Sequence, residues 1–419
     1  MLKIIQKLIS SKFLKTSLSV SLSKLISSLT NLLFMIFSVN ILTRSENGYL
    51  QYYLGYLPVV LAIAEFGLPA ALVKYLSVET ENLLEIGNIL LASIWIKLSS
   101  FLILCILGAS LSLFFKQDGL VVFVLIIGAT ITSFLTFFES IFVAFREYHY
   151  LVIWIPLGNL IKLLILYISY YHLNINLTYI DILAIFCISP IYILVLFFFL
   201  FPTKKIIWWG KKNLVIERFK SLLSFNLWAF SASIFAIVSD RLEIFLLKKF
   251  HTPEQVAIYG TSLQLFSGFQ ILFSTLNSML LPRLSSLVEN TEEFNQFLKK
   301  SFMICVAIAL FLFPGFFLAE PVLNFLFNNK YSDSIPVFQI LYPNYLLQLV
   351  FAPLGIALFA MGRPKMLASL ALIRLVTGFI FDNLLIPEYG VMGAGVSFFL
   401  GQVVSWLLLA GFFWATIWK

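Results

Sequence analysis

Residues 202–220 read PTKKIIWWGKKNLVIERFK and form the longest polar connection in an otherwise apolar chain. The segment combines lysines with two tryptophans, a composition typical of a peptide that lies on the anionic inner leaflet of a membrane. Six apolar segments precede it and six follow it. We therefore predict two lobes, residues 1–201 and 221–419, joined by a basic cytoplasmic linker at residues 202–220.

The composition on both sides of this linker excludes a soluble protein. Of the 419 residues, 61% are apolar and 11% are charged, whereas a soluble domain carries about 25% charged residues. Since a membrane-spanning helix needs about 20 apolar residues, a chain of this length holds roughly a dozen helices. We expect an all-α integral membrane protein with about twelve transmembrane helices in two six-helix bundles, and no appended catalytic domain.

The twelve predicted spans are separated by short polar breaks. They cover residues 16–42, 49–76, 86–114, 120–145, 148–170, 178–201, 221–247, 256–281, 297–327, 334–361, 365–386 and 391–417. With the N-terminus inside, eighteen Lys and Arg residues fall in inner loops and five in outer loops. The positive-inside rule therefore predicts that both termini are cytoplasmic. Because the net charge of +8 is spread over these loops, nucleic acid is not an expected partner.

Five cations lie within the predicted spans, namely Lys24, Lys97, Lys162, Arg241 and Arg374. Each costs roughly 2.5–3.5 kcal/mol in a bilayer unless polar groups or water receive it. In the first span the spacing of three and four residues predicts one polar face formed by Ser17, Ser21, Lys24, Ser28 and Asn31. We predict that the substrate-binding groups are Lys24, Asn31, Lys97, Lys162 and Arg374. Isolated hydroxyl groups instead favour a role in helix packing.

A second predicted set consists of Glu65, Glu139, Asp240, Arg241, Glu243 and Asp382. Its members either bind a coupling ion, H⁺ or Na⁺, or neutralise the cavity cations, and the sequence leaves both roles open. Asp240 and Arg241 are adjacent and cannot share a helix face. They therefore need different partners or an irregularity in the helix.

The sequence predicts neither an enzyme nor a metal centre. Cys105, Cys187 and Cys305 each lie inside an apolar run, and the three histidines are far apart in sequence. No span carries the carboxylate pairs, Ser/His arrangements or glycine-rich loops that catalysis requires. A glycosyltransferase or polymerase would also need a larger loop outside the membrane. We expect no cofactor apart from a coupling ion.

Short motifs occur in a defined order along the whole chain. The first half carries Asn47-Gly48-Tyr49 and Glu65-Phe66-Gly67-Leu68-Pro69-Ala70-Ala71-Leu72-Val73-Lys74-Tyr75-Leu76-Ser77. The second half carries Ser239-Asp240-Arg241, Ala257-Ile258-Tyr259, Leu281-Pro282-Arg283-Leu284-Ser285, Asn329-Lys330-Tyr331-Ser332-Asp333-Ser334, Met361-Gly362-Arg363-Pro364-Lys365 and Ile386-Pro387-Glu388-Tyr389-Gly390-Val391. In this order the chain resembles the polysaccharide flippases of the multidrug/oligosaccharidyl-lipid/polysaccharide exporter superfamily.

The resemblance implies a V-shaped pair of six-helix bundles around a central cavity. It also implies that an undecaprenyl-pyrophosphate-linked oligosaccharide, an O-antigen or capsule repeat unit, is moved from the cytoplasmic to the periplasmic leaflet of a bacterial inner membrane by alternating access. Pyrophosphate carries roughly two negative charges, so buried lysines and arginines would offset its desolvation. A polysaccharide polymerase and chain-length proteins of lipopolysaccharide biosynthesis are candidate partners, together with membrane lipids.

The chain departs from the family pattern at one position. The family often has an arginine near the end of the first span, where this chain has Asn40 and carries Arg44 four residues later, so no phosphate role is assigned there. Two alternatives remain, an ion-coupled multidrug or cation exporter and a flippase for the peptidoglycan lipid precursor. A cation exporter requires a net acidic cavity, which argues against a cavity that contains Lys24, Lys97, Lys162 and Arg374.

Overall fold

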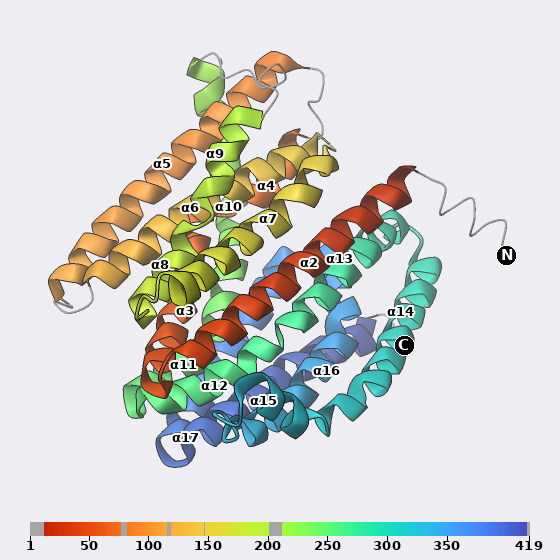
Figure 1. Cartoon of the computed structure of the whole chain (residues 1–419). Coiled ribbons are helices and arrows are strands. Elements are labelled where there is room, and N and C mark those ends of the chain that lie inside the picture. The colour runs from red at the N-terminus through yellow and green to blue at the C-terminus, as the bar shows by residue number, and fades with distance from the viewer. Residues whose placement is uncertain (1–11, 77–81, 115–118, 146, 201–211, 417–419) are drawn as a thin grey trace. The chain divides into compact units, whose positions relative to one another are not determined.

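The computed structural model describes residues 12–76, 82–114, 119–145, 147–200 and 212–416, and every regular element in these ranges is helical (Figure 1). The first half contains α2 (Lys12–Ile41), α3 (Arg44–Glu65), α4 (Leu68–Leu76), α5 (Leu83–Phe114), α6 (Gly119–Ala144), α7 (Tyr148–Tyr167), the π-helix η1 (Ile168–His172), α8 (Tyr179–Ile188) and α9 (Ile191–Leu200). The second half contains α10 (Lys212–Ser239), α11 (Leu242–Phe250), α12 (Pro253–Leu265), α13 (Ser267–Leu287), α14 (Thr291–Leu312), the 3₁₀ turn η3 (Phe313–Phe316), α15 (Ala319–Phe327), α16 (Ser334–Ala360) and α17 (Pro364–Thr416).

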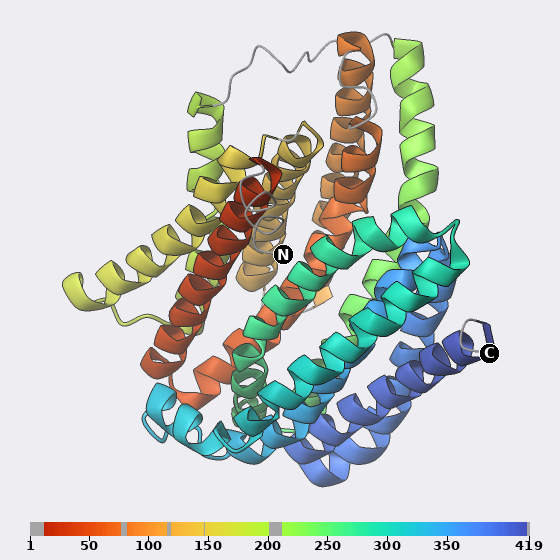
Figure 2. The ribbon, with the colours of Figure 1, turned by 90° about the vertical axis from the view of Figure 1, so that its right-hand side faces the viewer.

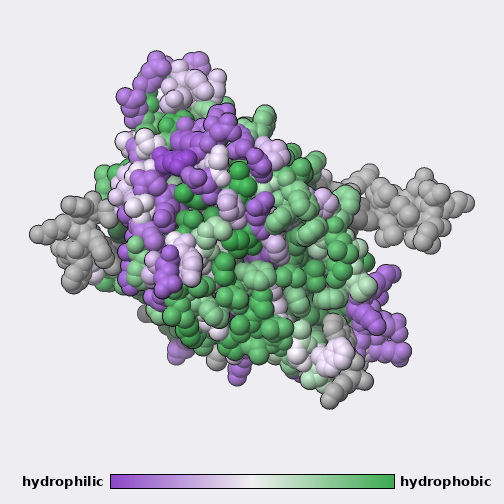
Figure 3. All heavy atoms as spheres, turned by 90° about the horizontal axis from the view of Figure 1, so that it is seen from below, coloured by the Kyte–Doolittle hydropathy of each residue, from purple (hydrophilic) through white to green (hydrophobic). Residues whose placement is uncertain are grey.

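The helices present apolar side chains to their surroundings, as lipid requires. Within the described ranges, nine helical stretches are long and apolar enough to cross a membrane. Large hydrophobic side chains are exposed, for example Phe311 with 82% of its surface accessible. Figure 3 shows a broad continuous apolar area on one face, beside a hydrophilic area. The predicted all-α, multi-pass membrane protein is confirmed, whereas the count of twelve spans stays a prediction.

Several helices are interrupted where the sequence forces a break. Between α3 and α4 the backbone adopts positive φ angles at Phe66 (47°) and Gly67 (69°), and the glycine takes this conformation without steric cost. Between α10 and α11 a turn at Asp240 and Arg241 interrupts the helix. A helix irregularity is one of the two alternatives expected for these adjacent charges. Helix α17 is kinked at Gly390, where φ is 53°.

The described chain divides into two compact units. Unit 1 contains the described residues of Met1–Phe34 and Tyr56–Phe230, and unit 2 contains those of Met35–Gly55 and Ser231–Lys419. These units differ from the contiguous lobes predicted from the sequence, because Met35–Gly55 packs with the second half of the chain. We call this segment the α2–α3 corner. The predicted linker lies outside the described residues as far as Lys211, and from Lys212 the chain is already helical, as the beginning of α10.

Unit 1 contains two clusters of buried side chains, contributed by α4, α5, α6, α7, α9 and α10. One cluster centres on Phe142, whose ring stacks on Tyr150 at a centroid distance of 4.8 Å. The other joins Leu68 of α4 and Ile96 of α5 to Leu222 of α10. An ion pair between Arg218 and Glu85 also connects α10 to α5. These contacts fix the helices that carry the charged side chains of unit 1.

Unit 2 has a more aromatic core. The ring of Phe266 stacks on Phe338 and on Tyr345, at centroid distances of 4.7 and 4.3 Å. The α2–α3 corner contributes Val39 to this core, against the α15 residues Leu323 and Phe327. This apolar contact is the physical reason why the corner belongs to unit 2.

Hydrogen bonds hold the α2–α3 corner in place. Lys330 donates from Nζ to the carbonyl oxygens of Val39, at 3.0 Å, and of Leu42, and thereby satisfies acceptors that the end of α2 leaves open. Asn40 donates to the carbonyl oxygen of Leu326 in α15, at 3.0 Å. The end of α2 therefore lies against α15, as Figure 2 also shows.

Two further polar contacts complete this arrangement. The buried amide of Asn47 donates to the hydroxyl groups of Tyr331, at 2.9 Å, and Thr261, at 3.1 Å. Arg44 forms an ion pair of 2.9 Å with Asp333. Arg44 thus has a carboxylate partner in its own unit.

Candidate functional site

Lys162 is a buried cation on α7 of unit 1, with 4% of its surface accessible. Its Nζ donates a hydrogen bond of 2.7 Å to Oδ1 of Asn31 on α2. The same Nζ lies 4.0 Å from the ring centroid of Phe186 and 5.0 Å from that of Phe34. All these partners are neutral, so the positive charge of Lys162 is solvated by an amide and two aromatic faces. The sequence-based prediction placed both Lys162 and Asn31 in the site, and the structure brings them together.

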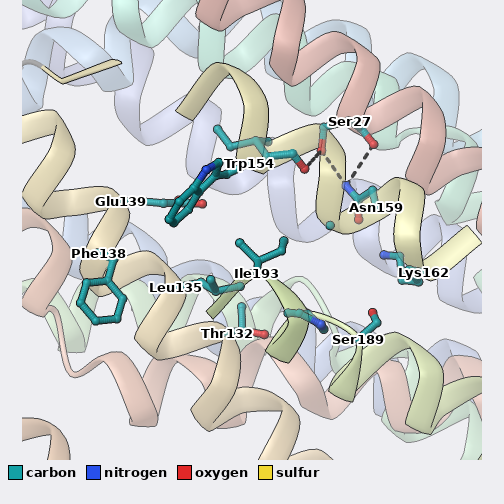
Figure 4. A pocket seen from close by; sticks show the side chains of 13 residues that line it. Ser27, Thr132, Leu135, Phe138, Glu139, Trp154, Asn159, Lys162, Ser189 and Ile193 are labelled. Atoms are coloured by element: carbon teal, nitrogen blue, oxygen red, sulfur yellow. Dashed lines mark hydrogen bonds between the residues drawn. The ribbon is translucent and has the colours of Figure 1, made fainter. Parts of the chain in front are cut away.

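Lys162 lines a cavity of about 240 Å³ inside unit 1 (Figure 4). Its polar wall contains Thr132, Glu139, Asn159, Lys162 and Ser189, and its apolar wall includes Trp154. The hydroxyl oxygen of Ser189, a residue with 3% of its surface accessible, has no hydrogen-bond partner among the described residues. Figure 4 shows Lys162, Asn159 and Ser189 towards one end of the cavity, and Trp154 with Glu139 towards the other.

The α2 face that packs against α7 carries Ser23, Ser27 and Asn31, of which Asn31 alone belongs to the polar face predicted from the sequence. Ser23 donates to the carbonyl oxygen of Val152 at 2.8 Å, and Ser27 donates to that of Ile155 at 3.2 Å. Asn159 in turn donates to Oγ of Ser27 at 2.6 Å. Sequence reasoning missed Ser23 and Ser27, although their spacing of four residues is also helical. It could not choose between neighbouring serine stripes on one helix.

Lys24 lies beside this packed face and is exposed. Its charge acts on the carboxylate of Glu139. The structure therefore places Lys24 and Glu139 in the same region of unit 1 and leaves the Lys24 ammonium accessible.

Lys97 on α5 is the second buried lysine of unit 1. Its Nζ donates to the carbonyl oxygen of Ser133, at 2.6 Å, and to the hydroxyl of the same residue. The carboxylate whose charge acts on Lys97 is that of Glu65, at the end of α3. Lys97 is thus embedded between α5 and α6 with a nearby counter-charge, unlike Lys162.

In unit 2, Arg374 of α17 forms an ion pair with Asp240. The guanidinium group also lies 5.4 Å from the ring centroid of Phe398. Asp240 therefore neutralises Arg374, one of the two roles that the sequence left open for this carboxylate. Arg241, the next residue, begins α11 as its N-cap.

Glu243 and Asp382 form a buried acidic pair in unit 2. Their accessible fractions are 2% and 0%, and each carries one carboxylate oxygen without a hydrogen-bond partner among the described residues. The other oxygen of Asp382 accepts a hydrogen bond from Ser397. The charge of Asp382 acts on Glu243. Two adjacent buried carboxylates with open acceptors can hold a proton or a monovalent cation between them.

Comparisons with known proteins show the family of the chain and its fold. The sequence model of a family described as "Polysaccharide biosynthesis protein" matches residues 13–288. The chain belongs to this family. The predicted membership of the polysaccharide flippase group is thereby confirmed.

A curated relative is the "Putative O-antigen transporter" of Shigella flexneri, which is 24% identical over 199 residues. The match covers 46% of this member of the polysaccharide biosynthesis family, and the chain spans about half the length of that relative. A second relative, the "Capsular polysaccharide biosynthesis protein CapF" of Staphylococcus aureus, is 23% identical over 45% of the chain and 49% of its own length.

Solved structures show the fold of this family member. The chain is similar to "Lipid II flippase MurJ, inward closed conformation", with a TM-score of 0.66, 13% identity, and coverage of 94% of this chain and 86% of that one. An "Inward-facing conformation of a multidrug resistance MATE family transporter of the MOP superfamily" gives a TM-score of 0.69 at 15% identity, with coverage of 93% of each chain. The fold is therefore that of membrane transporters and flippases rather than of enzymes.

Proposed function

We propose that the protein is a flippase for a lipid-linked oligosaccharide and acts by alternating access. In this proposal the substrate is an undecaprenyl-pyrophosphate-linked repeat unit, moved from the cytoplasmic to the periplasmic leaflet of a bacterial inner membrane with both termini in the cytoplasm. The family membership and the names of the relatives support a role in glycan export.

The observation that carries the proposal is the environment of Lys162. A buried ammonium group is costly, and its partners here are an amide oxygen and two aromatic rings rather than a carboxylate. Such a group remains available to an anion on the substrate. This favours a substrate with an anionic group over the cationic drugs that the alternative exporter would move.

We propose further that Glu243 and Asp382 bind the coupling ion, H⁺ or Na⁺. Their unpartnered oxygens in a buried setting support this role. Asp240 instead serves as the counter-charge of Arg374. A polymerase and chain-length proteins would receive the exported unit as partners.

Gene deletion tests the proposed function. Loss of the protein is expected to abolish the surface glycan while lipid-linked repeat units accumulate on the cytoplasmic side, and a plasmid copy should restore export. Extraction and mass spectrometry of the lipid-linked pool measures the accumulation. Normal glycan levels in a deletion strain without a second exporter would contradict the proposal.

Two alternatives have distinct readouts. A flippase for the peptidoglycan precursor would rescue a strain that lacks this essential activity, and we expect no rescue. A cation exporter would raise resistance to organic cations on overexpression, and we expect no such rise.

A further inference from the structure

We propose that the cavity of unit 1 is a subsite for one acidic sugar of the transported glycan, whose carboxylate pairs with Lys162. This inference rests on the proposed function, because it names a chemical class for part of the same substrate. It implies that the repeat unit contains a hexuronic acid or a sugar with an equivalent single carboxylate.

The size of the cavity limits the ligand to a single ring. Pockets that bury drug-sized ligands measure about 300–1,000 Å³, and this cavity measures about 240 Å³. One sugar residue fits inside, and because the cavity is partly open, the rest of the glycan can extend outside it.

The lining suits a hydroxyl-rich ring with one apolar face. The buried ring of Trp154 provides an aromatic surface for the C–H groups of a sugar. The unpartnered hydroxyl of Ser189 faces the cavity beside Lys162 (Figure 4). A buried hydroxyl without a partner costs free energy, so a ligand that hydrogen-bonds to Ser189 recovers that cost.

The charges in the cavity determine which end of the ligand lies where. Lys162 and Glu139 are the charged side chains of its lining, one of each sign, and Figure 4 places them towards opposite ends. A carboxylate at the Lys162 end forms one ion pair, and the hydroxyl groups of the same sugar donate to Glu139 at the other end.

The same charges disfavour pyrophosphate in this cavity. It carries roughly two negative charges, and the lining offers one cation, Lys162, and one carboxylate, Glu139, which would repel the second charge. The single Lys162 cannot neutralise both charges. We therefore expect the pyrophosphate to bind outside this cavity, and the exposed Lys24, which does not line the cavity, stays a candidate for it.

Binding to the purified full-length protein in detergent tests the inference by saturation-transfer NMR. The probes are glucuronate, glucose, octanoate and inorganic pyrophosphate. We expect glucuronate to bind about tenfold or more tightly than glucose, because charge-assisted hydrogen bonds are worth about that factor. Octanoate, a carboxylate without hydroxyl groups, should bind weakly, and pyrophosphate should not displace glucuronate.

Substitutions of two residues, Lys162 and Ser189, connect this binding to the cavity. Lys162→Met should remove the preference for glucuronate over glucose, and Lys162→Arg should retain it. Ser189→Ala should weaken glucuronate binding several-fold, whereas the matched control Ser140→Ala should not, because the hydroxyl of Ser140 bonds to the carbonyl oxygen of Thr136 within its own helix. If Lys162→Met does not fold, the Lys162→Arg and Ser189→Ala results decide alone.

Three results would overturn the inference. These are equal binding of glucose and glucuronate, displacement of glucuronate by pyrophosphate or octanoate, and no detectable glucuronate binding. None of them affects the proposed function, which the lipid-linked pool of the deletion strain measures independently. A strain that exports a purely neutral repeat unit through this protein would also overturn the inference while leaving flippase activity intact.

Discussion

Single cations of unit 1 differ in how their charge is satisfied. Lys97 has Glu65 as a nearby counter-charge, and Lys162 has neutral partners. Lys24 is exposed and acts electrostatically on Glu139. An accessible ammonium can meet the pyrophosphate, or it can simply offset the Glu139 carboxylate.

Substitution of Lys24 separates these two roles. Lys24→Ala should reduce glycan export about tenfold or more if the ammonium meets the carrier, because a charge-assisted contact is lost. Lys24→Arg should keep most of the export. Export and membrane abundance are measured together, with the exposed Lys300→Ala as a control for loss of charge.

A double variant provides the decisive comparison. If Lys24 contacts the carrier, Lys24→Ala combined with Glu139→Gln should export no more than Lys24→Ala alone. Recovery to the level of Glu139→Gln would show that Lys24 only neutralises the carboxylate. Wild-type export by Lys24→Ala at normal abundance would exclude the residue from the site.

The acidic pair of unit 2 allows a second prediction. Asp382→Asn keeps an acceptor for the Ser397 hydroxyl but removes the charge, so the protein should accumulate normally while export falls at least about tenfold. Transport in inverted vesicles with imposed Na⁺ or H⁺ gradients measures the effect. Glu320→Gln, at an exposed position on α15, is the control. Undiminished gradient-driven transport by Asp382→Asn would remove the pair from the coupling mechanism.

At the scale of elements, Gly48 sets how closely α3 approaches the start of α12. A methyl group at this position would lie 1.8 Å from the carbonyl oxygen of Pro253, which is backbone and cannot rotate away. Gly48→Ala should therefore destabilise unit 2 by about 1–3 kcal/mol or more, as overpacking does. Thermal unfolding in detergent measures the loss. Gly268→Ala, where a methyl group meets nothing within 4 Å, should be much milder, and equal effects would refute the explanation.

The sequence predicted those features of the elements that depend on local chemistry. The break after Glu65 follows from Gly67, two residues before Pro69, and the break at Asp240–Arg241 is one of the two alternatives that the sequence left open for these adjacent charges. Trp154 and Ser189 were not predicted as cavity residues, because a single aromatic or hydroxyl residue in an apolar helix has no periodic signal. That the α2–α3 corner packs with unit 2 was also not predicted. The hydrophobicity of a segment indicates that it is buried, but not which part of the chain it packs against.

At the scale of the whole molecule, the packing of the α2–α3 corner with unit 2 predicts how fragments of the chain behave. Residues 1–211 expressed alone would expose the apolar and polar groups that the α2–α3 corner buries in unit 2, among them Val39, Leu42 and Asn47. This fragment should be degraded rapidly, and co-expression with residues 212–419 should protect it. Pulse-chase labelling measures its half-life. A fragment with Val39→Ser, in which one of the exposed apolar side chains is replaced by a polar one, is measured for comparison. A stable isolated fragment would contradict the prediction.

The contact between Lys330 and the end of α2 can form only late in the synthesis of the chain. Val39 and Lys330 are 291 residues apart, and a ribosome adds about 5–20 residues per second, so roughly 15–60 s pass between the synthesis of one and the arrival of the other. During this interval the carbonyl groups at the end of α2 and the amide of Asn47 lack the hydrogen bonds that they form with Lys330 and Tyr331 in the folded protein. Until α15 and α16 are synthesised, these groups therefore need temporary partners, such as water or the insertion machinery.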